Sequence, residues 1–205
     1  KGLSPWMQKL PGGLIHVNVV GCALFAAISG SSAATVATVG KMSIPELRKR
    51  KYPEKILLGS LAGSGTLGLL IPPSIILIIY GVAVQESIAK LFIAGIIPGI
   101  MIALIFMSYV IIWSLVNKRK MPKISEKYSF LEKIKRSKQL LPVIILISGV
   151  IGSIYTGVAT ATEAASLGVV GSLILSYFQK SLTLETFKSS LLGATKTSCM
   201  IAFIL

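Results

Sequence analysis

The sequence predicts an all-α, polytopic membrane protein, and its composition and charge distribution support that prediction. Of the 205 residues, 53% are hydrophobic and only 14% are charged, whereas soluble domains carry about a quarter charged residues. The charges are also unevenly spread, because residues 57–84 and 91–117 contain none. A helix of about 20 apolar residues crosses a bilayer, so each of these stretches is long enough to span one.

The net charge of +14 raises the alternative of nucleic-acid binding. Most of the 21 basic residues, however, lie in two clusters, 41–55 and 118–138, that flank apolar stretches. Short cytoplasmic loops of membrane proteins collect Lys and Arg in this way. We therefore interpret both clusters as cytoplasmic and expect no nucleic-acid partner.

The basic clusters also set the order of the first predicted elements. Residues 1–13 are expected to form a lead-in on the cytoplasmic side, 45–55 a basic cytoplasmic loop and 117–139 a basic cytoplasmic linker. An even number of crossings must separate two loops on the same side of the membrane. A broken transmembrane helix at 56–84 and a transmembrane helix at 88–116 provide these two crossings.

Beyond the second basic cluster, two transmembrane segments are expected within 140–178. Residues 179–205 are expected to begin a further helix, and the chain itself to be a fragment of a longer polypeptide. Thr160 and Glu163 stand between the two segments, at the spacing of a capping box. A glutamate within a membrane segment is also a functional candidate, but we favour the structural, capping role.

Residues 14–44 predict a re-entrant helical hairpin rather than a span. As helices, 14–28 and 33–44 would be roughly 22 Å and 18 Å long, and neither length crosses a hydrocarbon core of about 30 Å. A Ser/Gly stretch, 29–32, separates them. The alternative is one ordinary span at about 14–34 followed by a surface segment. Irregular backbone at membrane depth must be buried in protein or line a polar cavity, so a hairpin tip predicts a site at the membrane midplane.

The tip Ser29-Gly30-Ser31-Ser32 has the chemistry of an ion and anion site. Hydroxyls and freed carbonyls suit a small cation, while the N–H groups that begin the second arm suit an anion. Discontinuous helices of transporters use their ends in this way for sodium and carboxylate. The alternative is that small residues here only allow close helix packing.

Residues 63–74 predict a second break. Pro72 and Pro73 have no N–H, so the carbonyls of Gly68 and Leu69 would lose their helical partners. Unwound backbone beside Ser64, Thr66 and Ser74 would form the second wall of a cation site. The alternative is a proline kink that neighbouring helices accommodate.

Residues 126–139 are polar with apolar side chains at helical spacing. They predict an amphipathic helix on the inner membrane face, held by Lys and Arg against anionic inner-leaflet lipid.

Two other protein classes fit the sequence less well. A non-transporting membrane scaffold would not need the glycine and proline breaks. An intramembrane enzyme would need a paired base and nucleophile, and the candidates His16 and Glu163 lie in different predicted segments. We therefore do not expect an enzyme.

Several short motifs occur in one order along nearly the whole chain. They are Leu10-Pro11-Gly12-Gly13-Leu14, Ile28-Ser29-Gly30-Ser31-Ser32, Ile44-Pro45-Glu46-Leu47, Ser64-Gly65-Thr66-Leu67-Gly68, Ile71-Pro72-Pro73-Ser74, Leu91-Phe92-Ile93-Ala94-Gly95-Ile96-Ile97-Pro98-Gly99 and Thr160-Ala161-Thr162-Glu163-Ala164-Ala165. In this order they resemble the large membrane subunits of TRAP (tripartite, ATP-independent, periplasmic) transporters, the DctM-like permease family. Ala161 stands where the family has proline, and Thr35 stands where many members carry Asp, so no carboxylate ligand is expected there.

The resemblance implies an elevator-type transporter of two inverted repeats, of which this chain would hold the first hairpin and the first broken helix. It implies a multi-pass protein of the bacterial inner membrane that imports an organic acid, such as a C4-dicarboxylate or a sialic acid, by symport with sodium ions. The expected partners are a small membrane subunit and a periplasmic binding protein. The alternatives are a sodium- or proton-coupled anion carrier that works without a binding protein, and the non-transporting scaffold.

These considerations give two sets of candidate site residues. The predicted substrate-binding residues, at the hairpin tip, are Ser29, Gly30, Ser31, Ser32 and Thr35. The predicted sodium-binding residues, which offer hydroxyls and freed carbonyls from both breaks, are Ser31, Ser32, Gly65, Thr66, Gly68 and Pro72. No metal other than sodium is expected.

Overall fold

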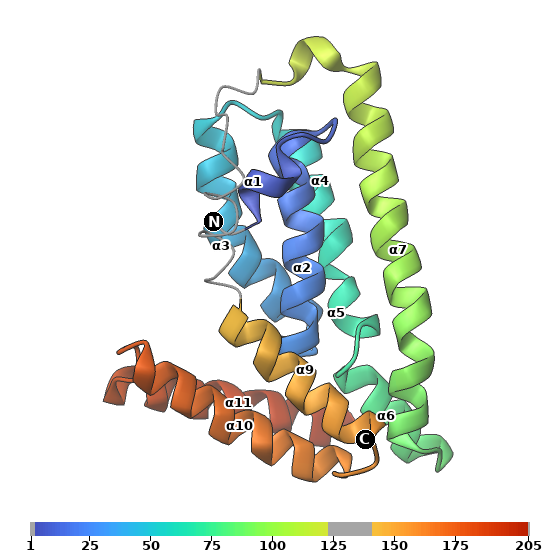
Figure 1. Cartoon of the computed structure of the whole chain (residues 1–205), viewed down its shortest axis with the longest axis vertical. Helices are drawn as coiled ribbons and strands as arrows, with labels where there is room; N and C mark the ends of the chain where they lie inside the picture. The colour runs from blue at the N-terminus through green and yellow to red at the C-terminus, as the bar shows by residue number, and fades with distance from the viewer. Residues whose placement is uncertain (1–2, 123–140, 205) are drawn as a thin grey trace. The chain divides into compact units, whose positions relative to one another are not determined.

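The computed structural model describes residues 3–122 and 141–204, and every regular element in those residues is a helix (Figure 1). The chain divides into two compact units, 1–143 and 144–205, which are described separately. The predicted amphipathic helix at 126–139, with the lipid contact assigned to it, lies outside the described residues. So does most of the predicted linker at 117–139.

The first unit begins with two antiparallel helices joined by a very short turn. After a short helix α1 (Ser4–Met7) and a 3-10 turn η1 (Gly13–Ile15), α2 runs over His16–Ser29 and α3 over Ser32–Lys49. Gly30 ends α2 in the left-handed region, with φ 57°, which glycine adopts without steric cost. The chain therefore reverses at the predicted tip.

The second arm of this hairpin is longer than the sequence predicts. The predicted hairpin ends at residue 44, before Pro45, but α3 continues through Pro45 to Lys49. The irregular connection to the next helix is accordingly much shorter than the predicted loop at 45–55. A proline removes one helical hydrogen bond, and the continued helix buries Leu47 in the core, where this side chain is only 2% exposed.

The next stretch is a helix interrupted near its middle. It comprises α4 (Glu54–Gly65), the single turn α5 (Leu67–Leu70) and α6 (Ile75–Val84). Between α5 and α6 the chain is extended, with Ile71 at φ −74°, ψ 121° and Ser74 at φ −120°, ψ 133°. The prolines at 72 and 73 occupy this extended segment, where a missing N–H breaks no helical bond.

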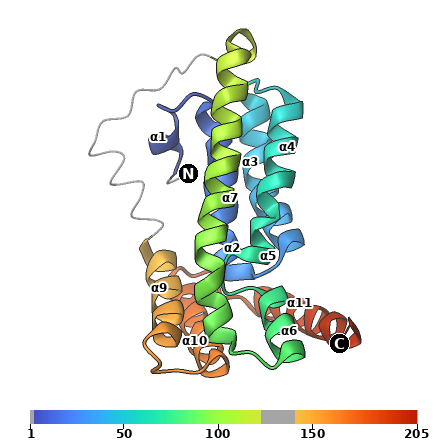
Figure 2. The same ribbon diagram turned by 90° about the vertical axis from the view of Figure 1, so that its right-hand side faces the viewer.

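The long helix α7 (Ile88–Val116) has the bounds of the predicted transmembrane helix 88–116 and ends in the basic 3-10 turn η2 (Lys118–Lys120). It packs against α2, α4, α5 and α6, and Figure 2 shows it running along the unit beside α2 and α4. Gly95 and Gly99 lie where α7 meets the extended segment. A Cβ atom on Gly95 would lie 3.0 Å from the Leu70 carbonyl oxygen, and one on Gly99 would lie 3.0 Å from the Ile71 side chain.

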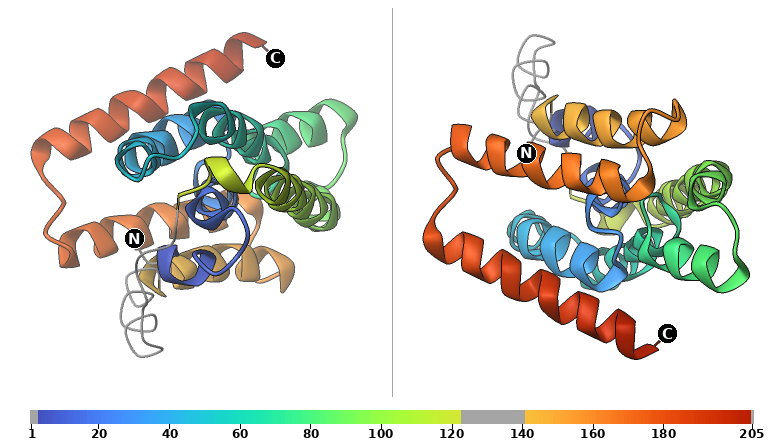
Figure 3. Two further views of the ribbon diagram at one scale, coloured as in Figure 1. Left: turned by 90° about the horizontal axis from the view of Figure 1, so that it is seen from above. Right: turned by 90° about the horizontal axis from the view of Figure 1, so that it is seen from below.

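The core of the first unit lies between α2, α3, α4 and α7, which are seen close to end-on in the left view of Figure 3. Its main cluster is apolar and gathers at the end of the hairpin opposite the tip. The buried members are Leu14, Ile15, Leu47, Tyr52, Ile56, Leu57 and Val110. This packing fixes the base of the hairpin against α4 and α7.

The second unit contains most of α9 (Leu141–Tyr155), together with α10 (Ala161–Phe178) and α11 (Leu184–Ile204). A Cβ atom on Gly168 of α10 would lie 3.3 Å from the Val150 side chain, and one on Gly171 would lie 2.5 Å from Leu146. The two helices therefore pack directly, through small residues.

Three helical stretches of the described residues are long and apolar enough to cross a membrane. They are Glu54–Val84, Ile88–Val116 and Ala161–Phe178. Two further helical stretches are apolar but shorter than these. They are α9, with 15 residues, and Gly13–Ser29, which contains the first hairpin arm. The fold is thus that of an all-α membrane protein, in which a short-armed hairpin packs beside a broken span.

Candidate functional site at the hairpin tip

The tip of the hairpin packs against the break in α4–α6. A Cβ atom on Gly68 would lie 2.8 Å from the carbonyl carbon and oxygen of Ser31 and 2.9 Å from the backbone nitrogen of Ser32. A Cβ atom on Gly30 would lie 2.8 Å from the Pro73 carbonyl oxygen. The Ile75 N–H also donates to the Gly30 carbonyl, at 3.4 Å. The two predicted breaks therefore meet as bare backbone.

Hydroxyl groups are concentrated on the hairpin side of this contact. Ser31 caps α3, with its side-chain oxygen accepting from the Ala34 N–H at 3.4 Å. Thr35 is fully buried, and its hydroxyl donates to the Ser31 carbonyl at 2.7 Å and lies 2.9 Å from the Ser29 hydroxyl. Ser31 and Ser32 are half-buried. Their hydroxyls and the start of α3 form the polar part of the tip.

The predicted sodium ligands are brought together only in part. Gly65 and Gly68 lie on the face of the broken helix that contacts the hairpin, close to Val36 and to Ser31, respectively. Pro72 is buried and packs toward Gly95 of α7. The Thr66 side chain, by contrast, is exposed and donates to the Gly63 carbonyl at 2.7 Å, away from the tip.

Several backbone carbonyl oxygens lie at the contact between the hairpin tip and the extended segment, and some of them accept hydrogen bonds from hydroxyl groups. The Leu69 carbonyl, which a proline deprives of its helical donor, accepts from the Ser74 hydroxyl at 2.5 Å. The Ser31 carbonyl accepts from the Thr35 N–H at 3.0 Å as well as from the Thr35 hydroxyl. The Pro73 carbonyl faces Gly30. Hydroxyl and carbonyl oxygens of this kind are suitable ligands for a hard, weakly polarising cation.

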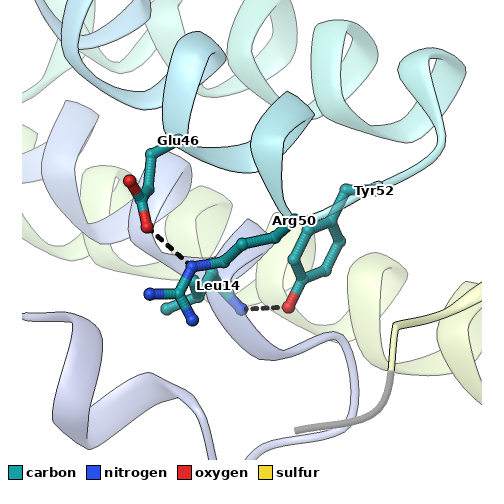
Figure 4. Close-up of polar contacts among 4 residues, drawn as sticks. All are labelled: Leu14, Glu46, Arg50 and Tyr52. Carbon is teal, nitrogen blue, oxygen red and sulfur yellow. Dashed lines mark hydrogen bonds and ion pairs between the residues drawn. The ribbon is translucent and has the colours of Figure 1, made fainter. Parts of the chain in front are cut away.

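At the base of the hairpin, a tyrosine that is not among the predicted site residues holds the start of the first arm (Figure 4). The Tyr52 hydroxyl accepts a hydrogen bond from the Leu14 N–H at 3.1 Å, and a Cβ atom on Gly13 would lie 2.5 Å from that hydroxyl. Burial raises the pKa of Tyr52, so its hydroxyl stays neutral at physiological pH. Beside it, the Arg50 Nε donates to the Glu46 carboxylate at 2.6 Å.

Replacing Tyr52 with Phe is expected to lower the melting temperature of the protein. The buried Leu14 N–H would lose its acceptor, and an unpaired buried donor costs about 1–3 kcal/mol. The measurement is thermal unfolding of the purified full-length protein in detergent. Tyr109→Phe is the matched control, because Tyr109 is 58% exposed on α7; equal melting temperatures for both variants would contradict the assigned role.

A second buried polar contact joins the first arm to α4. The Asn18 side-chain amide donates to the Leu57 carbonyl at 3.3 Å and to the Ser60 hydroxyl at 3.1 Å. His16, two residues closer to the base, is fully buried, and its Nε2 donates to the Pro11 carbonyl at 2.7 Å. In the sequence, both contacts are indicated only by a polar residue within an apolar stretch. The sequence does not identify the residue to which each one bonds.

Thr160 and Glu163 form a capping box at the start of α10. The Glu163 carboxylate accepts from the Thr160 N–H at 2.7 Å, and the Thr160 hydroxyl accepts from the Glu163 N–H at 3.3 Å. Both residues are exposed. Their hydrogen bonds are those that cap a helix start.

A family model described as "Tripartite ATP-independent periplasmic transporter, DctM component" matches residues 7–205. The chain is 38% identical, over 95% of its length, to the C4-dicarboxylate TRAP transporter large permease protein DctM of Pseudomonas aeruginosa. It is 36% identical, over 95% of its length, to the sialic acid TRAP transporter permease protein SiaT of Haemophilus influenzae. It is 39% identical, over 83% of its length, to the ectoine/5-hydroxyectoine TRAP transporter large permease protein UehC of Ruegeria pomeroyi.

The chain spans less than half the length of each of these relatives. It covers 45% of the Pseudomonas protein, 31% of the Haemophilus protein and 39% of the Ruegeria protein. All three are named as permeases of transporters.

Proposed function

The chain belongs to the DctM family of tripartite ATP-independent periplasmic transporters, and from this premise we propose that the full-length protein imports an organic acid by symport with sodium ions. The observation that carries the proposal is the contact between the two breaks. Backbone of Ser31 and Ser32 lies against Gly68 without intervening side chains. Such a contact concentrates hydroxyl and carbonyl oxygens where a small cation can bind.

The substrate would approach the same tip. Helix α3 begins at Ser32, and the first N–H groups of a helix carry partial positive charge that favours a carboxylate. The names of two of these relatives specify C4-dicarboxylate and sialic acid, and both are organic acids. We therefore assign the carboxylate to the start of α3 and the sodium ion to the oxygens of Ser31, Ser32 and the broken helix.

The proposal includes an elevator mechanism and two inverted repeats. In this arrangement the hairpin α2–α3 and the broken helix α4–α6 form the first repeat, and the second repeat belongs to the part of the relatives that this chain does not cover. A small membrane subunit and a periplasmic binding protein would complete the transporter, in the bacterial inner membrane. The tight packing of hairpin, broken helix and α7 supports their movement as one body.

Anionic lipid is the remaining proposed partner. The end of α3, the start of α4, the connection between them and η2 lie at one end of the first unit (Figure 1). Their exposed basic side chains include Lys49, Lys51, Lys55, Lys118, Arg119 and Lys120. Anionic headgroups of the inner leaflet attract such residues by about 1 kcal/mol each. In the proposal, that end of the unit lies at the cytoplasmic surface.

The test uses the full-length protein with its small subunit in proteoliposomes. Uptake of labelled succinate and labelled sialic acid is followed with an inward sodium gradient or with choline, and with the binding protein present or omitted. Uptake that requires both sodium and the binding protein supports the proposal. Sodium-driven uptake without the binding protein would instead indicate a simpler carrier, and absence of uptake across a wide panel of organic acids would refute transport of this substrate class.

Replacing Ser31 and Ser32 together with Ala is expected to weaken sodium dependence. Two oxygen ligands would be lost, and the sodium concentration for half-maximal uptake should rise by about tenfold or more. The matched control replaces Ser166 and Ser172, two exposed serines that donate to carbonyls of their own helix α10. An unchanged sodium requirement in the Ser31/Ser32 variant would remove both hydroxyls from the proposed site.

A further inference from the structure

Three hydrogen bonds at the hairpin tip begin and end on the same residue, Ser31. Its N–H donates to the Ser29 hydroxyl at 3.4 Å. The Ser29 hydroxyl lies 2.9 Å from the Thr35 hydroxyl. The Thr35 hydroxyl donates to the Ser31 carbonyl at 2.7 Å. We call this arrangement of Ser29, Ser31 and Thr35 the hydroxyl ring.

The direction of each bond in the hydroxyl ring follows from the number of hydrogens together with the contact distances. A hydroxyl has one hydrogen, and a carbonyl can only accept, so the Thr35 hydrogen points to the Ser31 carbonyl. The Ser29 hydroxyl lies 2.9 Å from the Thr35 hydroxyl and 3.3 Å from the Ser31 carbonyl, and the shorter contact assigns its hydrogen to Thr35. The Ser29 oxygen is left to accept from the Ser31 N–H. Bonds ordered head to tail in this way strengthen one another.

The hydroxyl ring leaves Thr35 and Ser29 without a free hydrogen to donate to an anionic substrate. Thr35 is fully buried between the two arms, with its single hydrogen committed to Ser31. The Ser31 carbonyl already accepts from both the N–H and the hydroxyl of Thr35. A ligand at the tip would meet the side chains of Ser31 and Ser32 rather than these groups.

What the ring does is fix the orientation of Ser31. The two peptide groups of Ser31 are both held, and the residue keeps an extended conformation, φ −131° and ψ 127°, between two helices. Its carbonyl carbon and oxygen form the surface that Gly68 contacts. Any rotation of the Ser31 peptide would therefore change the distance between the tip and the broken helix.

We propose that Thr35 and Ser29 are positioning residues, whose hydroxyls hold Ser31 in the conformation that binds sodium. The sequence predicts both as substrate ligands, and the proposal replaces that role. This inference rests on the proposed function, because it presupposes a sodium site at Ser31. Without the ring, the tip occupies additional conformations. The apparent affinity for sodium then falls in proportion to the fraction of competent molecules.

The test measures sodium binding without any organic substrate. The melting temperature of the purified full-length protein with its small subunit is recorded against sodium chloride, with choline chloride keeping ionic strength constant. Thr35→Val removes the hydroxyl but keeps the shape, Thr35→Ser keeps the hydroxyl, and Ser29→Ala removes the other link. Thr195→Val is the matched control, since the Thr195 hydroxyl donates to the Leu191 carbonyl in α11, four residues back as Thr35 does to Ser31.

The expected result is a rise of about three- to tenfold in the sodium concentration at half-maximal stabilisation for Thr35→Val and for Ser29→Ala. Thr35→Ser and Thr195→Val should keep the wild-type midpoint. The double variant with Thr35→Val and Ser29→Ala should be little worse than either single one, because one lost link opens the ring. A purely structural role would lower the melting temperature in choline and leave the sodium midpoint unchanged.

The outcomes separate this inference from the proposed function. If the wild-type protein is stabilised by sodium but Thr35→Val and Ser29→Ala keep its midpoint, the positioning role is wrong and the sodium site stands. If sodium gives the wild-type protein no more stabilisation than choline does, the sodium site and the positioning role both fall. Should Thr35→Val fail to fold, Ser29→Ala, at the half-buried position, decides the question.

Discussion

Replacing Gly68 with Ala is expected to reduce sodium-driven uptake by at least tenfold. The new Cβ atom would lie 2.8 Å from the carbonyl group of Ser31 and 2.9 Å from Ser32 N, and all of these atoms belong to the backbone. No side chain can rotate to make room, so the hairpin tip and the broken helix must separate. Inserting a methyl group into a packed contact costs about 1–3 kcal/mol, here directly across the proposed ion site.

Gly59→Ala is the matched control for that experiment. Gly59 lies on α4, the first part of the same broken helix, and a Cβ atom there would meet nothing within 4 Å. Alanine is favoured over glycine in a helix by about 1 kcal/mol, so this variant should be as stable as the parent protein or slightly more stable. Uptake by Gly68→Ala that matches uptake by Gly59→Ala would show that the close contact does not matter for transport.

The positions of both breaks could be predicted because glycine and proline act locally. Glycine can adopt a positive φ without steric cost, as Gly30 does, and the two prolines at 72 and 73 have no N–H whatever surrounds them. The end of α7 at Val116 could be predicted for a similar reason, since the uncharged stretch that begins after Lys90 stops at Lys118. Such signals are contained within a few residues of chain.

The orientation of Thr66 could have been predicted from helical phase, although Thr66 is adjacent in sequence to Gly65. Its hydroxyl and its place beside the break predict a sodium ligand. On a helix, however, residues three apart share a face, as Gly65 and Gly68 do, while the next residue is turned by about 100°. Thr66 is accordingly exposed and bonded to Gly63. Helical phase, applied to residues 63–68, indicates which of them faces the hairpin.

Contacts between distant residues could not be predicted from one sequence. Tyr52 bonds to Leu14, and Asn18 bonds to Ser60, across 38 and 42 positions, respectively. Periodicity indicates that such residues lie on a buried face but does not identify a partner on another helix. The continuation of α3 past Pro45 has the same origin, because the burial of Leu47 depends on packing against the rest of the core.

The tip is held from two directions, and we therefore expect its glycines to tolerate substitution poorly. On one side the hydroxyl ring fixes Ser31 within the hairpin. On the other, the extended segment 71–74 lies between Gly30 of the hairpin and Gly95 and Gly99 of α7. Packed interfaces of this kind resist small displacements. A change at Gly30 therefore cannot be absorbed by movement of the segment toward α7.

Gly30→Ala is expected to abolish the sodium-dependent rise in melting temperature. Gly157→Ala is the control that separates backbone strain from the clash with the Pro73 carbonyl. Both glycines have positive φ, 57° and 71°, so alanine costs each about 1–2 kcal/mol of backbone strain. Only at Gly30 does the new Cβ atom also approach a backbone oxygen, that of Pro73 at 2.8 Å; Gly157 has nothing within 4 Å. Gly157→Ala should therefore melt lower but keep its response to sodium. Loss of the response in both variants, or in neither, would mean that the contact between Gly30 and Pro73 does not form the site, because backbone strain alone is common to the two positions.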